Sequence, residues 1–141
     1  MFAKKVGLVR LAASLLALLL LCACGARAPR TVHAPDEAAR QTWLKELGWQ
    51  VEEEPLEVLQ LELPRPLDEG WTAYAQAQEG QGLPFGHFAG RSVERITYHV
   101  ENHPTAPDAQ LNLFLCGEEI IGGDVFLPGP EGYQTNLEFP K

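Results

Sequence analysis

The chain has 141 residues, of which 45% are hydrophobic, and its 19 acidic residues outnumber its 11 lysines and arginines to give a formal net charge of −8. This length suffices for one small domain with a single core and leaves no room for a second. An acidic chain without a basic patch argues against nucleic acid as a partner, because binding to phosphates requires clustered positive charge.

The N-terminal residues have the three-part layout of a secretory signal. Lys4, Lys5 and Arg10 form a basic start, and an uncharged apolar run follows from Leu11 to Leu21. At about 1.5 Å per helical residue this run covers roughly 17 Å, well short of the ~30 Å hydrocarbon core of a membrane. Residues 1–23 are therefore predicted to be a signal peptide rather than a transmembrane span.

The end of this segment resembles the lipobox of bacterial lipoproteins. Leu21 and the small Ala23 precede Cys24, and Cys22 takes the place usually held by a small or hydroxyl-bearing residue. The resemblance implies cleavage after Ala23, diacylation of the Cys24 thiol with fatty acids such as palmitate, and a location on the outer side of the cell membrane. Cys22 is a poor anchor, because leucines precede it where a small residue is needed.

Residues 24–35 are predicted to be a lipid-bearing linker, because they are rich in Ala, Arg and Pro and show no apolar period. Arg27 and Arg30 make this linker basic, whereas every carboxylate lies at or beyond Asp36. Cys116 is the one cysteine that remains after cleavage and lipidation, so the mature chain cannot form an internal disulfide.

From Asp36 to Leu47 apolar residues recur at helical spacing. Gly48 is placed for a left-handed C-cap, and Trp49 can pack back on Leu44 as in a Schellman motif. After an acidic run, Leu56 to Leu63 alternate between apolar and polar residues and are predicted to form a strand.

A second helix is predicted from about Leu67 to Glu79, with Asp68 as its N-cap. Residues 80–90 form a loop whose apolar side chains are expected to plug the edge of the sheet. The next strand is predicted from Val93 to Glu101, where apolar and polar side chains alternate.

A β-hairpin follows, with strands Leu111–Cys116 and Glu119–Phe126. Gly117-Glu118 joins them, and glycine at the first loop position favours a type II′ turn. Gly122-Gly123 indicates a bulge or a close approach of another backbone.

The order helix, strand, helix and then three strands predicts an α+β domain. We expect a small antiparallel sheet of about four strands with two helices packed on one face. The domain is predicted to span residues 36–127, and the Pro- and Gly-rich residues 128–141 are predicted to be a loosely ordered tail.

No catalytic set is evident in the mature chain. Ser92 is its only serine and has no nucleophile motif around it, whereas Cys116 precedes Gly117 and Glu118, where a neighbouring carboxylate disfavours the thiolate. Paired-carboxylate hydrolysis usually needs a larger cleft than such a domain provides. We therefore expect a protein that is not an enzyme and that has no cofactor.

The sequence offers one candidate metal site, formed by His99, Glu101 and His103. These residues lie on one face of the strand if the strand continues to His103. The outer two would lie about 13 Å apart and could not readily converge on one ion, so an incidental polar strand face is the preferred interpretation.

Asp124 has two possible interpretations. It is either a carboxylate that satisfies backbone donors at a bulge or a ligand contact beside bare backbone, and the first interpretation is preferred.

Several segments together resemble an uncharacterised extracytoplasmic domain, classed as a domain of unknown function, from clostridia-type bacteria. They are Leu44–Val51, Glu54–Val58, Tyr74, Gly90–Tyr98, Asn112–Leu113 and Ile120–Val125. The resemblance covers roughly residues 38 to 126 and implies the fold and the location, without an activity or functional residues.

The leading functional hypothesis is a lipid-anchored, extracytoplasmic binding or accessory module that recognises a partner protein, an envelope component or a peptide. A metal-handling lipoprotein that uses the face of His99, Glu101 and His103 is the alternative. A small hydrolase that uses Cys116 or Ser92 is the third hypothesis.

Overall fold

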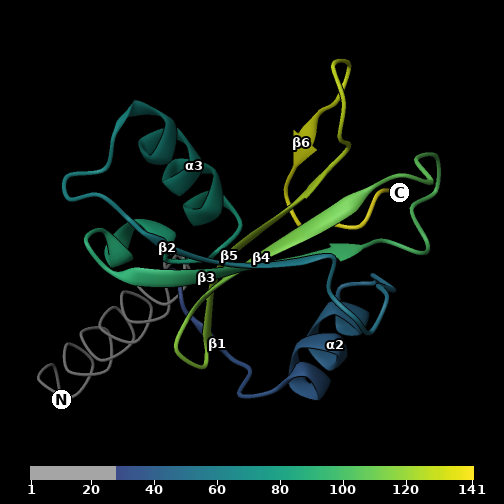
Figure 1. Cartoon of the computed structure of the whole chain (residues 1–141), viewed down its shortest axis with the longest axis horizontal. Helices are drawn as coiled ribbons and strands as arrows, with labels where there is room; N and C mark the ends of the chain where they lie inside the picture. Colours follow the sequence, from purple (N-terminus) through teal and green to yellow (C-terminus); the bar gives the residue numbers. More distant parts are fainter. Residues whose placement is uncertain (1–27) are drawn as a thin grey trace, which may run out of the picture.

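Residues 28–141 are described by a computed structural model, in which six antiparallel strands form one sheet (Figure 1). The predicted signal peptide and the predicted lipidation site Cys24 lie outside the described residues. The elements along the chain are β1 (Val32–His33), α2 (Glu37–Glu46), β2 (Glu57–Glu62), α3 (Glu69–Gly80), the 3₁₀ helix η1 (Phe85–Phe88), β3 (Ser92–His99), β4 (Gln110–Cys116), β5 (Glu119–Phe126) and β6 (Gln134–Thr135). The strands lie in the order β1-β5-β4-β3-β2, and β6 also pairs with β5. The α+β class with an antiparallel sheet and two helices is therefore confirmed.

The two helices cover opposite faces of the sheet, which corrects the prediction that both pack on one face (Figure 1). Leu44 of α2 belongs to one core together with Ile96 and Leu113 of the sheet. Phe114 points to the other face and belongs to a second core, against which Trp71 of α3 packs. Because β4 and β5 carry buried apolar side chains on both faces, each face needs its own cover.

The predicted ends of the first helix are confirmed. The Asp36 carboxylate caps α2 by accepting a hydrogen bond from the backbone N–H of Ala39 at 2.8 Å. Gly48 has a φ of 101°, and the N–H of Trp49 donates to the carbonyl of Leu44 at 2.9 Å, as a Schellman motif requires. Trp49 is then fully buried as a core anchor.

The second helix brings an aromatic cluster onto the sheet. Its N-cap is Asp68, as predicted, and its inner face carries Trp71 and Tyr74. Phe85 of η1 is completely buried, with its ring centroid 4.9 Å from that of Tyr74 and 5.2 Å from that of Phe114. The loop of residues 80–90 thus fills the core beneath α3 instead of plugging the sheet's edge.

The hairpin between β4 and β5 has the predicted turn and bulge. Gly117 has a φ of 60°, whereas Glu118 does not have a positive φ, which is the pattern of a type II′ turn. Phe114 pairs with Gly122 but Leu115 pairs with Ile120, so β5 carries an extra residue at this point.

Both segments that flank the predicted domain belong to the fold, so the boundaries 36–127 are too narrow. Within the predicted linker, β1 pairs with the start of β5, and Ala34 is completely buried. Within the predicted tail, β6 pairs with the end of β5, and Leu137 is only 4% exposed. The indole N–H of Trp49 donates to the carbonyl of Leu137 at 2.8 Å. These two-residue strands raise the strand count from the predicted four to six.

Candidate functional site

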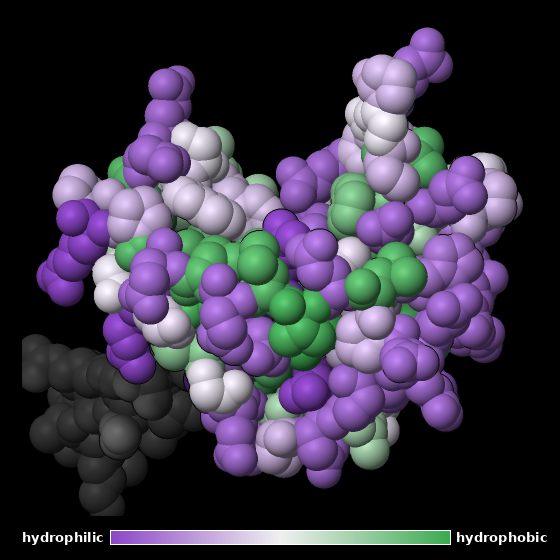
Figure 2. All heavy atoms as spheres, in the orientation of Figure 1, coloured by the Kyte–Doolittle hydropathy of each residue, from purple (hydrophilic) through white to green (hydrophobic). Residues whose placement is uncertain are grey.

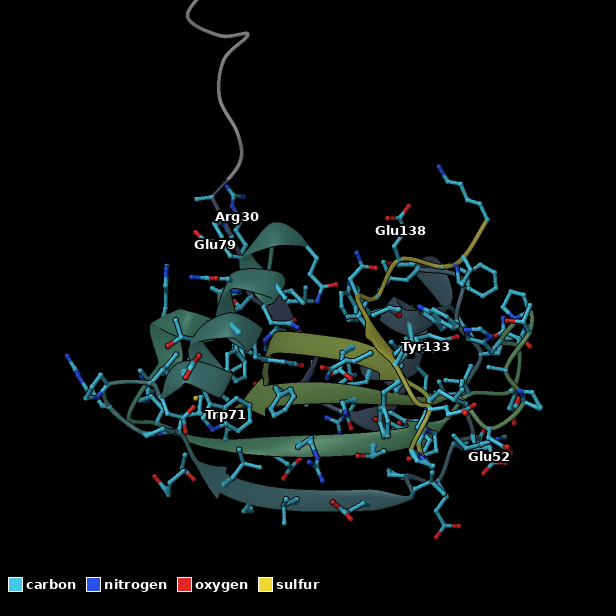
Figure 3. All side chains as sticks on the ribbon, turned by 90° about the horizontal axis from the view of Figure 1, so that it is seen from above. Arg30, Glu52, Trp71, Glu79, Tyr133 and Glu138 are labelled. Carbon is cyan, nitrogen blue, oxygen red and sulfur yellow. The ribbon has the colours of Figure 1, made fainter. Side chains whose placement is uncertain are left out.

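A groove with a volume of about 680 Å³ lies on the α3 side of the sheet, over strands that α3 leaves uncovered. Figure 2 shows this side hollowed between α3 and the segment that connects β5 to β6. In Figure 3, Trp71 under α3 and Tyr133 on the C-terminal segment mark the two ends of this face. The volume of the groove exceeds that of a second cavity of about 420 Å³ lined by Trp43 and Leu47, and the groove is the candidate ligand site.

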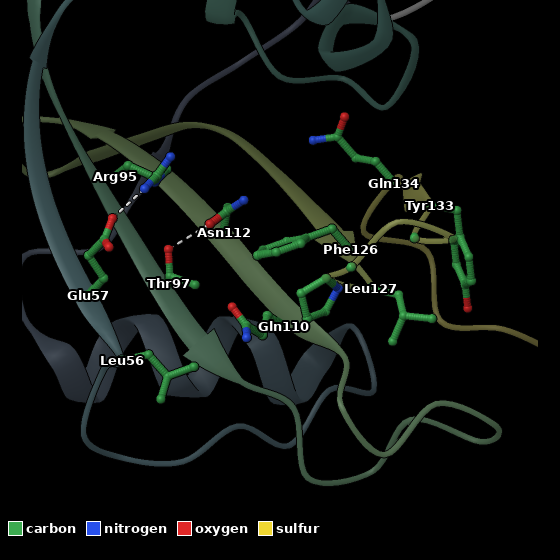
Figure 4. A pocket seen from close by; sticks show the side chains of 13 residues that line it. Leu56, Glu57, Arg95, Thr97, Gln110, Asn112, Phe126, Leu127, Tyr133 and Gln134 are labelled. Carbon is green, nitrogen blue, oxygen red and sulfur yellow. Dashed lines mark hydrogen bonds and ion pairs between the residues drawn. The ribbon is translucent and has the colours of Figure 1, made fainter.

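Strand alternation makes the floor of the groove polar. On β3 and β4, apolar side chains fill the α2-side core, and the polar residues between them face the groove. The polar lining of the floor consists of Glu57, Arg95, Thr97, Gln110 and Asn112 (Figure 4). The wall from the β5–β6 connection is more apolar and includes Phe126, Leu127 and Tyr133.

The charged part of the floor is a pair between neighbouring strands. The guanidinium of Arg95 on β3 donates to the carboxylate of Glu57 on β2 (Figure 4). Their side chains are 31% and 53% exposed, so water screens the pair and its net stabilisation is on the order of 0–1 kcal/mol. The pair leaves this part of the floor with no net charge while exposing both a donor and an acceptor.

A buried chain of hydrogen bonds supports the neutral part of the floor. The Thr97 hydroxyl donates to Asn112 at 2.7 Å, and the Asn112 amide donates to Asp124 at 3.2 Å. On the other carboxylate oxygen, Asp124 accepts a 2.6 Å hydrogen bond from the hydroxyl of Tyr74 on α3. Asp124 is 2% exposed, and the chain joins α3 to the three central strands.

Burial sets the protonation behaviour of this chain. Burial raises the pKa of Tyr74 well above its usual value, and the nearby Asp124 carboxylate raises it further, so the phenol remains a proton donor. Burial also raises the pKa of Asp124, while the hydrogen bonds from Tyr74, Gln134 and Asn112 lower it. The preferred interpretation, in which Asp124 satisfies backbone donors at a bulge, is therefore wrong, because side chains of Tyr74 on α3 and Asn112 on β4 supply its hydrogen bonds.

Gln78 of α3 and Gln81, the residue that caps its C-terminal end, both bind the backbone of Gly123 on β5. Gln78 accepts a hydrogen bond from the N–H of Gly123 at 2.8 Å, and Gln81 donates to the carbonyl of Gly123 at 2.7 Å. Gln81 also accepts from the N–H of Leu137 at 2.9 Å. These bonds hold α3, β5 and the C-terminal segment together at one side of the groove.

The three residues of the metal hypothesis are not brought together. His99 lies at the end of β3 and contacts the carbonyl oxygen of Pro107 at 3.1 Å, whereas Glu101 lies beyond the strand. His103 accepts a hydrogen bond from the N–H of Ala106 at 2.9 Å and so stabilises a turn. Within residues 28–141, no group of three or more His, Cys, Asp or Glu side chains is placed to hold a metal ion.

The two candidate nucleophiles lie next to each other without a base. The Cys116 thiol is 3.8 Å from the backbone carbonyl of Ser92 and packs at the edge of the α3-side core. Ser92 is exposed on the first position of β3. In the described part of the chain no hydrogen bond joins either side chain to a histidine or a carboxylate, so the geometry offers no activated nucleophile.

The floor residues of the groove were not predicted as a site. The alternation of β3 places Arg95 and Thr97 on one face, but a polar face is also what solvent exposure produces. Only the pairing of β3 with β4 brings Asn112 beside Thr97, and only the β5–β6 connection adds a wall. The one sequence signal that could have indicated this site was the presence of polar residues at positions of β3 and β4 that pair with each other.

Comparison with known protein families, with curated proteins and with solved structures finds no match for this chain. The resemblance to an extracytoplasmic domain therefore stays a prediction. Among residues 28–141, neither helix has the length and hydropathy needed to cross a membrane.

Proposed function

We propose that this protein is a lipid-anchored, extracytoplasmic binding module without catalytic activity, and that the groove over β3 and β4 is its ligand site. The observation that carries the proposal is the composition of the groove. Its floor combines a neutralised charge pair with the hydrogen-bonded side chains of Thr97 and Asn112, and its wall is more apolar. Ligand sites commonly have volumes of about 300–1,000 Å³ and use a few placed polar groups to orient the ligand.

The chemistry of the floor favours a neutral, polar ligand. Arg95 and Gln110 present donors, while Glu57 and Gln110 present acceptors, so the floor suits groups such as hydroxyls and amides that both donate and accept. A charged ligand would have to disrupt the pair of Arg95 with Glu57. Envelope components and peptide backbones carry such neutral groups, which agrees with the expected location.

The anchor is tested by the substitution Cys24→Ala. This change removes the thiol that is acylated, so we expect incorporation of labelled palmitate to be lost and the protein to leave the membrane fraction or to remain as uncleaved precursor. Cys22→Ala is the matched control and should keep both the label and the membrane location. Persistent labelling of Cys24→Ala would contradict the proposed anchor.

The groove is tested by filling it. Gln110 lines the floor, is half-buried and makes no side-chain hydrogen bond in the described part of the chain, so Gln110→Trp should occupy the groove while the fold is kept. In a thermal-shift screen of soluble envelope fragments and peptides, we expect ligands that raise the Tm of the original protein but leave that of Gln110→Trp unchanged.

Gln76→Trp is the control for this experiment, because Gln76 is exposed on α3 and lies outside the groove. A ligand of the groove should stabilise this variant as much as the original protein. The proposal is wrong if the screen finds no ligand, or if every ligand stabilises Gln110→Trp equally.

A further inference from the structure

The edge of the sheet at β2 has an unpaired backbone. β2 is the last strand of the sheet order and pairs only with β3, and in Figure 3 its faint blue-teal ribbon forms the outer border of the sheet. The N–H of Leu63 donates to the carbonyl of Arg91 at 2.9 Å, and the antiparallel register continues this pattern through Leu61 and Leu59. The residues whose N–H and carbonyl groups point away from the sheet are therefore Val58, Gln60 and Glu62. A further strand can pair with them.

The apolar side chains of β2 are arranged symmetrically about Gln60. Leu59 and Leu61 flank Gln60 and lie on the α3 side of the sheet, as do their partners on β3, Arg95 and Val93. Leu59 is 41% exposed, and Leu61 is half-buried. When a second copy of β2 pairs antiparallel with the two Gln60 residues opposite each other, Leu59 of each copy lies opposite Leu61 of the other copy on one face. This register pairs every outward-facing residue of β2, whereas a register centred on another residue pairs fewer.

The charges at the two ends of β2 are complementary in an antiparallel pair. Glu53 and Glu54 precede the strand, whereas Arg65 and Arg91 outnumber Glu62 at its other end, and all five residues are exposed. Neither arginine and neither of the first two glutamates has an opposite charge within 4.0 Å among the residues that the structure describes. Antiparallel pairing of two copies places the acidic end of each strand beside the basic end of the other. Screening at physiological salt limits repulsion between the other acidic groups to about 8 Å.

We propose that two copies of this protein associate through their β2 strands, which pair antiparallel and centred on Gln60, so that the two sheets become one. Backbone hydrogen bonds hold the strands together, and the pairs of Leu59 with Leu61 bury apolar surface. The leucine symmetry and the complementary ends favour a second copy over a strand of another protein, because both features require the same strand on each side.

The dimer gives the two grooves a common orientation. A two-fold axis that pairs two edge strands antiparallel is perpendicular to the sheet, so both grooves open on the same side of the joined sheet. The association surface touches the groove lining only at Leu56 and Glu57. The proposed dimer therefore does not depend on whether the groove binds a ligand.

Cysteine cross-linking in membranes of cells that produce the full chain tests this register. In a hydrogen-bonded antiparallel pair the Cα atoms of opposite residues lie about 5.5 Å apart, within reach of a disulfide. Gln60→Cys should therefore form a disulfide-linked dimer under mild oxidation. Each variant also carries Cys116→Ala, and the protein with Cys116→Ala alone gives the baseline.

Val58→Cys is the matched control, because it places a thiol on the same face of the same strand. In the proposed register the two copies of residue 58 are offset by about 13 Å along the strands, too far for a disulfide. Val58→Cys should therefore cross-link with Glu62→Cys when both variants are produced together, but not with itself.

Charge reversal tests the contact between the two ends of β2. Arg65→Glu places a carboxylate beside Glu53 and Glu54 of the second copy, so cross-linking through Gln60→Cys should fall about tenfold or more. Adding Glu54→Arg restores opposite charges and should recover most of the dimer, whereas Lys45→Glu on α2 makes the same change of charge elsewhere and should have no effect.

Four results would each overturn the proposal. They are the absence of a Gln60→Cys dimer, Val58→Cys dimers as abundant as those of Gln60→Cys, a cross-link from Gln60→Cys to a different protein in place of a second copy, and a protein with both Arg65→Glu and Glu54→Arg that dimerises no better than one with Arg65→Glu alone.

Discussion

Replacing Gly123 by alanine is expected to lower the free energy of unfolding by about 3 kcal/mol. A Cβ at this position would lie 2.9 Å from the backbone carbonyl oxygen of Asn112 and 2.7 Å from a methyl group of Leu137. The methyl group can move, but the carbonyl belongs to β4, so β4 and β5 must separate. Chemical denaturation followed by tryptophan fluorescence measures the loss.

Gly80→Ala is the matched control for this prediction. Gly80 ends α3, and no atom lies within 4 Å of the position that its Cβ would take. Because alanine is the better helix former, this variant should be unchanged or more stable by up to about 1 kcal/mol. A Gly123→Ala protein as stable as the Gly80→Ala protein would show that the two strands do not approach each other as described.

Replacing Asp124 by alanine is expected to cost about 3 kcal/mol at neutral pH, because two buried donors lose their acceptor. These donors are the Tyr74 hydroxyl and the Asn112 amide, and the Asp124 carboxylate that accepts from them is only 2% exposed. Asp108→Ala is the control, since Asp108 is exposed, and should stay within about 0.5 kcal/mol. Equal unfolding midpoints of the two variants would contradict a structural role for the buried chain.

The substitution Asp124→Asn adds a pH readout to the same prediction. Burial raises the pKa of Asp124 above its ordinary value of 3.8 in the folded protein, so the folded state binds this proton more tightly than the unfolded state does. The stability contributed by this group is complete below pH 3.8 and is lost as the pH rises through the raised pKa. The original protein should therefore lose stability relative to Asp124→Asn over this interval, and a constant difference would contradict the raised pKa.

Much of the local structure could be predicted because its causes lie within a few residues. The cap at Asp68, the left-handed Gly48 and the turn at Gly117 each follow from the chemistry of one side chain or its absence. The glycine pair before Asp124 also indicated the bulge and the close backbone approach that the sheet contains.

The groove could not be predicted in the same way. Its floor depends on the strand register that sets Thr97 against Asn112, and its wall depends on where the chain returns after β5. The metal hypothesis failed to gain support for a related reason, because the chain leaves the strand after His99 and the next histidine stabilises a turn.

The sequence by itself determined the α+β class, the hairpin and the helix ends, and it alone supports the lipid anchor at Cys24. The tertiary structure decided that α2 and α3 lie on opposite faces, that residues once expected to be linker and tail complete the sheet, and that Asp124 bonds to Tyr74. The reason is physical. Caps, turns and alternation express local backbone preferences, whereas faces, edges and cavities depend on which distant segments bury their apolar surface against one another.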